Sequence, residues 1–445
     1  MPFTTNNNRV DRRRFISATG AAGVTLLTGC TGGSDGGSNG GGNGDGGVSL
    51  TINMFTGQAT DKNIKAFEEA VAAFEEQTGY SVKIKGIAQA GQVINQTQTA
   101  VQAGSPPNLA FMPAGGLLGM ITNDFLEPVG DRIDSAKTFS RSDFTRERKF
   151  DIASLGGEEI YGVPAMSGHW GSLYYNPDML EQAGYDPKKP NFKTWPEFLD
   201  VARDVKDATG VKPIGLSGAD HIQTTVQWSG FFHTTGRDSW LTDDKSDTVL
   251  DSQPGIDAAK FAQTAVEDGL VPDGIVNMNG IDLRELFKSE KLFAYQTGSW
   301  EKAILDEQSD VNYGITWNPQ HPDGRPSGFS GGWFFTIPKG AEHQDEAWSL
   351  IEHLMKVENI SKWAQLPPIL TDGLKNTFDG FQDGLGRDVG DIFVKEILNA
   401  AFPTIHANQG KMWAAQRQEY QQLLLGQKNA DQAMGDLADK VRDLL

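Results

Sequence analysis

The stretch VSLTINMFTGQATDKNIKAFEEAVAAFEEQTGYSVKIKGI, residues 48–87, decides the class of fold. Residues 48–55 alternate apolar and polar side chains, which predicts a strand. After a turn, apolar residues recur at helical spacing from Ile64 to Phe74, with Asp61 as the expected N-cap and Gly79 as the end. Residues 81–87 predict a second strand. A strand, a helix and a strand in this order indicate parallel pairing with helices packed on the sheet.

The pattern continues with a helix at residues 93–101 and a buried strand at 108–112. Ligands of parallel sheets lie beyond the carboxyl ends of the strands. Thr56 and Gln58 follow the first strand, and Met112 and Ala114 lie at the end of the third, so we expect these four residues at a ligand site. Neither turn carries a GxGxxG or Walker-type loop, which predicts that the protein uses no nucleotide cofactor.

The remaining chain also mixes strands and helices. Thr194 is the expected N-cap of a helix with Pro196 in its first turn. Residues 414–445 show an amphipathic helical pattern without proline. Further strands are expected at residues 171–176, 212–217, 291–296, 312–317 and 332–338. A chain of 445 residues is too long to fold around one simple hydrophobic core. The sequence therefore predicts an α/β protein of two lobes.

The formal net charge is −19, which argues against a nucleic acid or an anionic membrane as partner. The charge fits simple solubility and fits equally well a halophilic protein, because high salt shortens the range of self-repulsion. After Ile16 no apolar run approaches the length of a membrane span. We also find no His, Cys and carboxylate set at metal-ligand spacing, so we expect no metal site.

The N-terminus indicates export and anchoring. Arg12 and Arg13 precede a short apolar segment, a pattern that resembles a twin-arginine signal. Leu27-Thr28-Gly29-Cys30 resembles a lipobox, and Cys30 is the only cysteine in the chain. Residues 31–47 include ten glycines, which predicts a flexible tether. We therefore expect residues 1–30 to be a signal with a lipobox, and lipidated Cys30 to hold the protein on the outer face of the cytoplasmic membrane.

From about residue 49 to the C-terminus, the chain resembles the extracellular solute-binding proteins of ABC importers, in particular the sugar-binding cluster that includes maltose-binding protein. No single segment is specific, but their order and spacing are. The segments are AFEEAVAAFEEQTGYSVKI at 66–84, GSPPNL at 104–109, YGVP at 161–164, LYYN at 173–176, TWPEF at 194–198, TGSW at 297–300, the strand and Pro-Lys-Gly at 333–340, and the tail at 426–445.

The resemblance implies a periplasmic-binding-protein-like fold, in which two lobes are joined by crossing strands and close on a ligand by a hinge. We expect residues 48–163 with about 314–342 to form the first lobe, and residues 164–313 with about 343–445 to form the second. The implied partners are a small sugar and the permease subunits of an ABC importer. The implied state is a monomer without a cofactor.

The resemblance also places candidate contacts in the second lobe. Trp300 matches the family's stacking Trp, and Trp413 and Arg417 match a Trp and an Arg one helical turn apart that face the ligand. His169 and Trp170 follow the first hinge crossing, where the family often has a polar contact. From the residues alone, Trp300 could instead be a core side chain, and Arg417 could be an exposed side chain over a packed Trp.

Four further candidates follow from position in the chain. Asp220 and Gln223 come after the strand at 212–217 and could hydrogen-bond sugar hydroxyls. Asp220 could equally be an exposed loop acid. Gly332 and Trp333 open a later strand, where glycine permits close approach of a ligand, although Trp333 could belong to the core.

The sequence thus predicts a receptor for a mono- or disaccharide. The end of the first strand and that of the third lack the aromatic or acidic residue common in the family, which favours a compact ligand over a long oligosaccharide. A receptor of the same fold for a polyol, a glycerol-phosphodiester or a polyamine is the alternative. An anchored glycosidase would need paired carboxylates, and no catalytic motif marks such a pair, so we expect no enzyme.

Overall fold

The computed structural model describes residues 47–57, 59–144, 148–190, 192–219, 221–364, 392–393, 399–402 and 404–445. Gly47–Leu445 forms one compact unit. The predicted signal, Cys30 and nearly all of the tether lie outside the described residues, as do Gln58 and Asp220.

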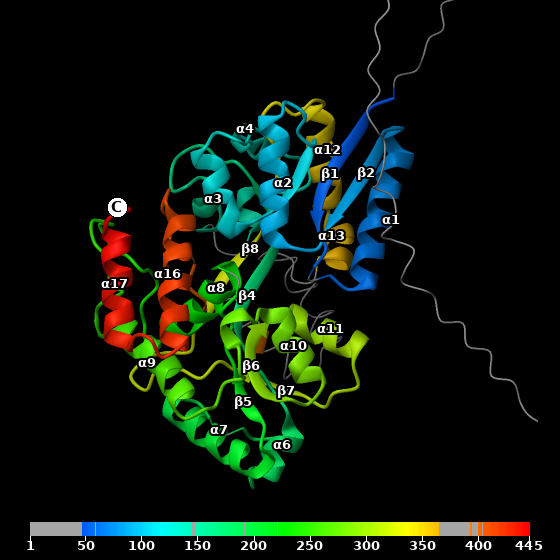
Figure 1. The fold of residues 1–445 in the computed structure, drawn as a ribbon. Helices are drawn as coiled ribbons and strands as arrows, with labels where there is room; N and C mark the ends of the chain where they lie inside the picture. The colour runs from blue at the N-terminus through cyan, green and yellow to red at the C-terminus, as the bar shows by residue number, and fades with distance from the viewer. Residues whose placement is uncertain are drawn as a thin grey trace, which may run out of the picture. The chain divides into compact units, whose positions relative to one another are not determined.

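One mixed sheet of eight strands runs through the unit in the order β2-β1-β3-β8-β4-β6-β5, with β7 paired to β4 (Figure 1). The strands β1 and β2 are parallel, and so are β1 and β3, as the opening sequence predicts. β5 and β6 are also parallel, whereas β4 and β8 run antiparallel to their neighbours. The strands are β1 (Ser49–Phe55), β2 (Ser81–Ile87), β3 (Leu109–Pro113), β4 (Val163–Tyr175), β5 (Lys212–Gly215), β6 (Leu292–Gly298), β7 (Gly314–Trp317) and β8 (Phe329–Thr336).

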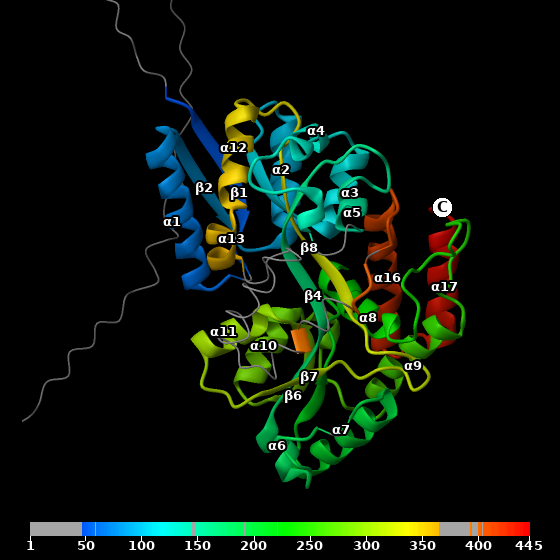
Figure 2. The same cartoon turned by 180° about the vertical axis from the view of Figure 1, so that it is seen from behind.

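The first hydrophobic core joins β1, β2 and β3 to the helices around them. It includes Phe67 and Phe74 on the apolar face of α1, in agreement with the helical spacing. Its helices are α1 (Asp61–Thr78), α2 (Ala90–Gln102), α3 (Ala114–Thr122), α4 (Gly130–Asp134), α5 (Arg148–Ala153), α12 (Gln344–Leu354) and α13 (Val357–Trp363). The packing of α12 and α13 beside α1, seen in Figure 2, differs from the expected assignment of residues 343–445 as a block to the second lobe.

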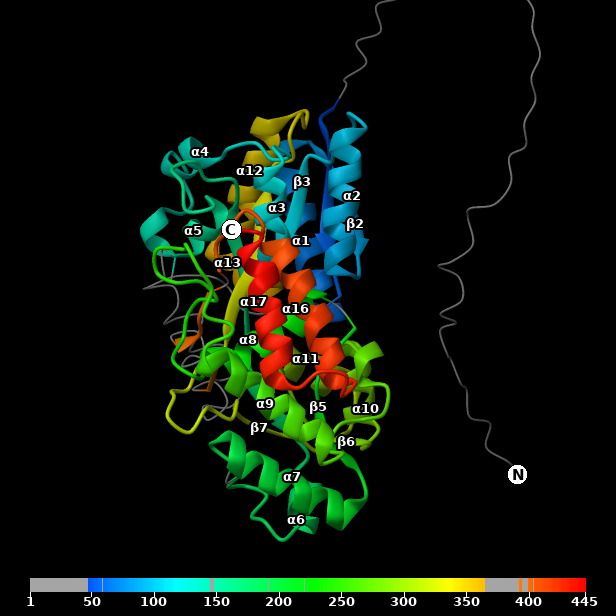
Figure 3. The same ribbon diagram turned by 60° about the vertical axis from the view of Figure 1, so that its left-hand side comes forward.

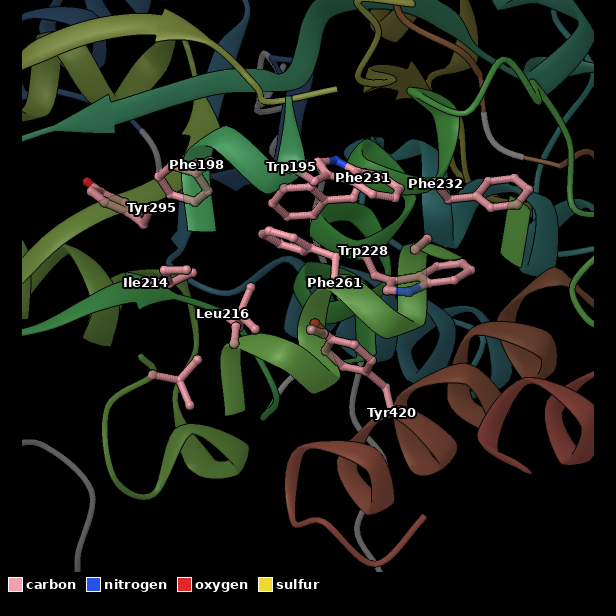
Figure 4. Close-up of a cluster of buried hydrophobic side chains, with 14 of the residues drawn as sticks. Trp195, Phe198, Ile214, Leu216, Trp228, Phe231, Phe232, Phe261, Tyr295 and Tyr420 are labelled. Carbon is pink, nitrogen blue, oxygen red and sulfur yellow. The ribbon is translucent and has the colours of Figure 1, made fainter. Parts of the chain in front are cut away.

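The second hydrophobic core surrounds β5, β6 and β7. Figure 4 shows its aromatic centre, where Phe231 lies 4.7 Å from Phe261 and Trp228 stacks on Phe232 at 5.4 Å between ring centroids. Its helices are α6 (Pro177–Gln182), α7 (Trp195–Thr209), α8 (His221–His233), α9 (Gln253–Glu267), α10 (Gly280–Lys288), α11 (Trp300–Gln308), α16 (Gln409–Leu424) and α17 (Ala430–Arg442). Short 3-10 turns lie at Arg141–Asp143 and Ile275–Asn277.

The long strands β4 and β8 connect the two cores. Val163 near the start of β4 belongs to the first core, and Tyr175 at its end belongs to the second. β8 runs the other way, with Phe329 in the second core and Phe335 in the first. Because β4 and β8 each run from one core into the other, the two lobes share one continuous sheet.

Local signals explain several helix ends. Thr194 and Glu197 form the capping box of α7, which confirms the predicted N-cap. The N-cap of α1 is Thr60 rather than Asp61, because the Thr60 hydroxyl accepts from the amide of Asn63 at 3.2 Å. The C-terminal amphipathic region is two helices, α16 and α17, which lie side by side in Figure 3. Gly426, with φ of 66°, lies in the turn that separates them.

Candidate ligand-binding site

Four aromatic rings form a continuous row where the crossing strands enter the second core. We call Trp300, Trp170, Phe329 and Trp413 the aromatic row. The centroids of Trp300 and Trp170 lie 4.3 Å apart in an edge-to-face arrangement. Phe329 follows at 6.3 Å from Trp170, and Trp413 at 6.0 Å from Phe329. The row therefore gathers side chains from α11, β4, β8 and α16.

Glycine 298 sets the place of the first ring in this row. Trp300 is the first residue of α11, and its indole turns back over Gly298. A Cβ added to Gly298 would lie 2.0 Å from Trp300 Cζ3 and 2.4 Å from the carbonyl oxygen of His169. A side chain at this position would collide with both, so the glycine is required for the close approach.

The last ring of the row contacts the first lobe. A Cβ at Gly115, in the first turn of α3, would lie 2.5 Å from Trp413 Cζ3. Ala114 begins the same helix and lies beside Gly331 of β8, at 3.9 Å from an added Cβ. Trp413 and Ala114, both predicted contacts, thus flank one region although 299 residues separate them in the sequence.

Two buried glycines lie beside the row, one on each crossing strand. Gly168 of β4 pairs with Gly331 of β8. A Cβ at Gly168 would meet no atom closer than Trp170 Cζ3 at 3.5 Å, which is an ordinary contact. A Cβ at Gly331 would lie 3.2 Å from Phe329 Cε1, which is tighter than an ordinary contact. At both positions the strand backbone therefore lies next to the aromatic row without an intervening side chain, as a close ligand approach would require.

Buried polar side chains accompany the rings. The side-chain amide nitrogen of Gln296 donates to the carbonyl oxygen of Trp170 at 3.4 Å, and Thr225 donates its hydroxyl to Gln416 Oε1 at 2.7 Å. Several atoms in these or adjacent residues are buried without a hydrogen-bond partner among the described residues. They are Gln296 Oε1, Gln416 Nε2, Ser299 Oγ, Ser330 Oγ, and both amide atoms of Asn318, whose backbone bonds to Gly171. Each such atom costs about 1–3 kcal/mol unless a ligand or water pairs with it.

A buried ion pair lies behind Trp300. Glu301 is 1% exposed, and its carboxylate accepts bidentate hydrogen bonds from Arg284 of α10. Thr297 donates its hydroxyl to the same carboxylate at 3.2 Å. Burial is the largest influence on the pKa of Arg284 and lowers it, but the charge and hydrogen bonds of Glu301 raise that pKa above its ordinary value. The pair is therefore neutral overall.

Two of the other predicted contacts lie in the first core. Trp333 is 5% exposed and stacks on Phe55 at 4.0 Å with an interplanar angle of 10°. Met112 is fully buried in β3, where it pairs with Phe334 of β8. Thr56 follows Phe55 and is half-buried, and Gly332 pairs with Ser167 of β4. For Trp333 the packing agrees with the core alternative.

Gln223 and Arg417 bond to backbone groups. The side-chain oxygen of Gln223 accepts from the Gly280 amide at 2.7 Å and so helps to cap α10. Arg417 is half-buried and donates to the carbonyl oxygen of Ala219 at 3.3 Å. It lines a surface groove between α16 and α17, whereas Trp413 on the same helix is buried against α3.

The structure brings Trp170, Trp300 and Trp413 together, and places buried His169 in the strand beside them. Sequence reasoning missed the polar members of the region and one ring. The amides of Gln296 and Gln416 each lie three or four residues from a predicted Trp, and Phe329 lies two residues before the first glycine of β8. Their closeness in the sequence to predicted contacts was the signal that could have identified these residues.

Within the described ranges no group of three or more His, Cys, Asp or Glu side chains could hold a metal ion. The same residues include no helix that is long and apolar enough to cross a bilayer.

A two-lobed α/β unit with crossing strands, and with rings and unpaired polar atoms buried beside them, defines a binding protein. The family described as bacterial extracellular solute-binding protein matches residues 59–359, and the chain belongs to this family. The match confirms the predicted class of protein and shows a binding protein rather than an enzyme, in a family that works outside the cytoplasm.

Individual proteins agree with this assignment. The galactooligosaccharide-binding protein of Bacillus subtilis (strain 168) is 23% identical over 296 residues, which are 66% of this chain and 66% of that protein. The sn-glycerol-3-phosphate-binding periplasmic protein of Pectobacterium atrosepticum is 25% identical over 377 residues, 78% of this chain and 80% of that protein. A maltose-bound protein of T. maritima has a TM-score of 0.76 at 20% identity over 89% of this chain and 100% of its own. The structural likeness confirms the predicted two-lobed fold.

Proposed function

We propose that this protein captures a mono- or disaccharide and delivers it to the permease of an ABC importer. The observation that carries the proposal is the set of buried, unpaired amide and hydroxyl atoms beside the aromatic row. Sugars have hydroxyl groups around the ring edge and C–H groups on the ring faces. Planar amides pair with the first, and aromatic faces pack on the second. The sugar-binding relative from Bacillus subtilis and the maltose-bound likeness support this ligand class.

The charge of the region favours a neutral ligand. The unpaired atoms named above belong to amides and hydroxyls, and the nearby carboxylate of Glu301 is neutralised by Arg284. Arg417, four residues after Trp413, also has a buried unpaired Nε atom, but its guanidinium donates to the Ala219 carbonyl and lines the groove between α16 and α17. A polyamine would need unpaired carboxylates, and a glycerol-phosphodiester would need unpaired Arg or Lys side chains. A polyamine and a glycerol-phosphodiester are therefore less favoured ligands than a sugar. An uncharged polyol is less favoured than a sugar but more favoured than these two charged ligands.

The proposed contacts are the aromatic row with Gln296 and Gln416, together with the predicted residues Gln58 and Asp220. The crossing strands β4 and β8 would act as the hinge. Closure would exclude water and strengthen the hydrogen bonds to the sugar.

We further propose that the protein is an exported, monomeric lipoprotein. The paired arginines and lipobox-like segment support a twin-arginine signal and lipidation of Cys30, and the glycine-rich residues would let the body turn on its anchor. Replacement of Cys30 by Ala should release the protein from the membrane fraction into the medium. Retention of the Cys30→Ala variant on the membrane would refute the anchor.

The ligand proposal is tested by thermal unfolding against a panel of mono- and disaccharides, polyols, polyamines and glycerol-phosphodiesters in molar KCl. A ligand that binds only the folded state adds about 2.7 kcal/mol at 100 times its dissociation constant. We expect a sharp rise in melting temperature with one small sugar. A rise only with a polyamine or a phosphodiester would keep the fold and overturn the ligand class.

A further inference from the structure

The turn that carries Trp300 is held from two sides. On one side, Arg284 Nη2 donates to Glu301 Oε2 at 3.0 Å, and Thr297 donates to the same oxygen. On the other side, the hydroxyl of Tyr174 donates to the carbonyl oxygen of Gly298 at 3.1 Å and accepts from the amide of Lys302 at 3.1 Å. The backbone from Gly298 to Lys302 therefore has little freedom to move.

Of these contacts, the one from Arg284 reaches the turn from another helix. Arg284 lies in the middle of α10, which packs on β6. The N-terminus of α10 is tied to α8 through Gln223, whose side-chain oxygen accepts from Gly280. α10 therefore bridges the segment that begins α8 and the segment that begins α11. Both segments were predicted from the sequence to contact the ligand.

A buried ion pair is a costly way to attach one helix to another. Arg284 is 8% exposed and Glu301 is 1% exposed, so both lose most of their hydration. An apolar pair of similar volume often provides as much stability or more. A bidentate guanidinium–carboxylate contact fixes both the distance and the relative orientation of its two side chains. An apolar contact does not impose such an orientation.

We propose that Arg284 is a positioning residue that orients the Trp300 indole through Glu301, and so sets the affinity of the site without touching the ligand. The affinity part of this inference rests on the proposed sugar-binding function. The positioning part does not, because it concerns the place of one indole in the protein without ligand.

The indole pair provides a direct measurement. Trp170 and Trp300, at 4.3 Å and 64°, are close enough to couple excitonically and to give a couplet in far-ultraviolet circular dichroism. The spectrum of Trp300→Phe subtracted from that of the wild type isolates this couplet from other indole pairs, such as Trp228 and Trp240. The couplet depends on the mutual orientation of the two rings and needs no ligand.

The test compares the full-length wild type with the double variant Arg284→Met/Glu301→Leu, which replaces the pair by apolar side chains and leaves neither charge unpaired. We expect the couplet to shrink or change shape while the melting temperature falls by only a few degrees, because the Thr297 hydroxyl loses its acceptor. Arg284→Lys, which retains one charged contact but loses the bidentate geometry, should give an intermediate couplet. If the double variant does not fold, Arg284→Lys decides the matter, and a wild-type couplet in it overturns the proposal.

Titration with maltose forms the second arm. If the wild type binds maltose, its dissociation constant should rise by about tenfold in the double variant, the lower end of the losses that follow removal of a partner supporting a metal ligand. The control variant Arg203→Met/Asp268→Asn removes an ion pair between α7 and the residue after α9, and should change neither couplet nor affinity. An unchanged couplet overturns the positioning role. Absence of maltose binding by the wild type excludes maltose as the ligand and leaves the other sugars of the panel to test the proposed function, and the couplet then decides the positioning role alone.

Discussion

Substitution of Gly298 by Ala places one methyl group into the most crowded point of the proposed site. The new Cβ would lie 2.0 and 2.1 Å from two indole carbons of Trp300 and 2.4 Å from the His169 carbonyl oxygen. The indole could rotate away, but the carbonyl belongs to β4, which pairs with β6 at this register. Both Trp300 and the strand contact must therefore shift.

The size of the effect follows from these two shifts. Overpacking a buried position costs about 1–3 kcal/mol. Loss of the edge-to-face contact between Trp300 and Trp170 adds about 0.5–1.5 kcal/mol. We expect a total near 3 kcal/mol, which corresponds to a drop in melting temperature of roughly 6–12 °C for a lobe of this size. Sugar binding should weaken as well, because the first ring of the row is displaced.

Differential scanning calorimetry with and without sugar measures both effects. Gly119→Ala serves as the matched control, since Gly119 lies exposed in α3 and an added Cβ there meets no atom within 4 Å. The control should gain about 0.5–1 kcal/mol from the lower entropy of the unfolded chain. If Gly298→Ala melts within 2 °C of the wild type, on the order of half a kcal/mol, the packing described around Trp300 is wrong.

Three other predictions follow. Gly168→Ala should keep the wild-type melting temperature but lose sugar affinity, because its Cβ fits the protein yet fills the space beside the row; unchanged affinity in a titration would remove the crossing strands from the site. Burial lowers the pKa of His233 from 6.5 to about 4, so the folded state holds it neutral and the unfolded state takes up the proton first. Its contribution, about 3 kcal/mol, is complete above pH 6.5 and is lost as the pH falls towards 4. Urea unfolding of His233→Gln should show a flatter pH dependence in that window, and an unaltered slope would contradict the assignment. The net charge of −19 predicts a higher melting temperature in molar KCl than at about 0.1 M, because salt screens self-repulsion; equal values would argue against adaptation to salt.

Much of the fold was accessible from the sequence because local signals agree with the tertiary structure. The strand predicted at residues 81–87 and the N-cap predicted at Thr194 match the structure, since alternation and capping depend on neighbours in the chain. The lengths of β4 and β8 were underestimated. Their central residues include Gly168, Gly331 and Gly332, which carry no strand propensity and are extended through pairing with each other's strand.

The proposed site was only partly predictable for a different reason. The tryptophans were found because the segments around them resemble a family. Gln296 and Gln416 were missed because a buried glutamine differs from an exposed one only in its tertiary surroundings. Trp333 was ambiguous in the same way, and its stacking on Phe55 depends on strands that are 278 residues apart in the chain.

The most direct test of the central claim is isothermal titration of the best sugar from the thermal screen into the wild type and into Gln296→Leu. Leucine keeps the bulk of the side chain and removes the buried amide that is left partly unpaired. The account predicts one site per chain in the wild type and an affinity at least about tenfold weaker in the variant, equivalent to roughly 1.4 kcal/mol, with little change in melting temperature. Equal affinities would place the sugar elsewhere and contradict the site proposed for it.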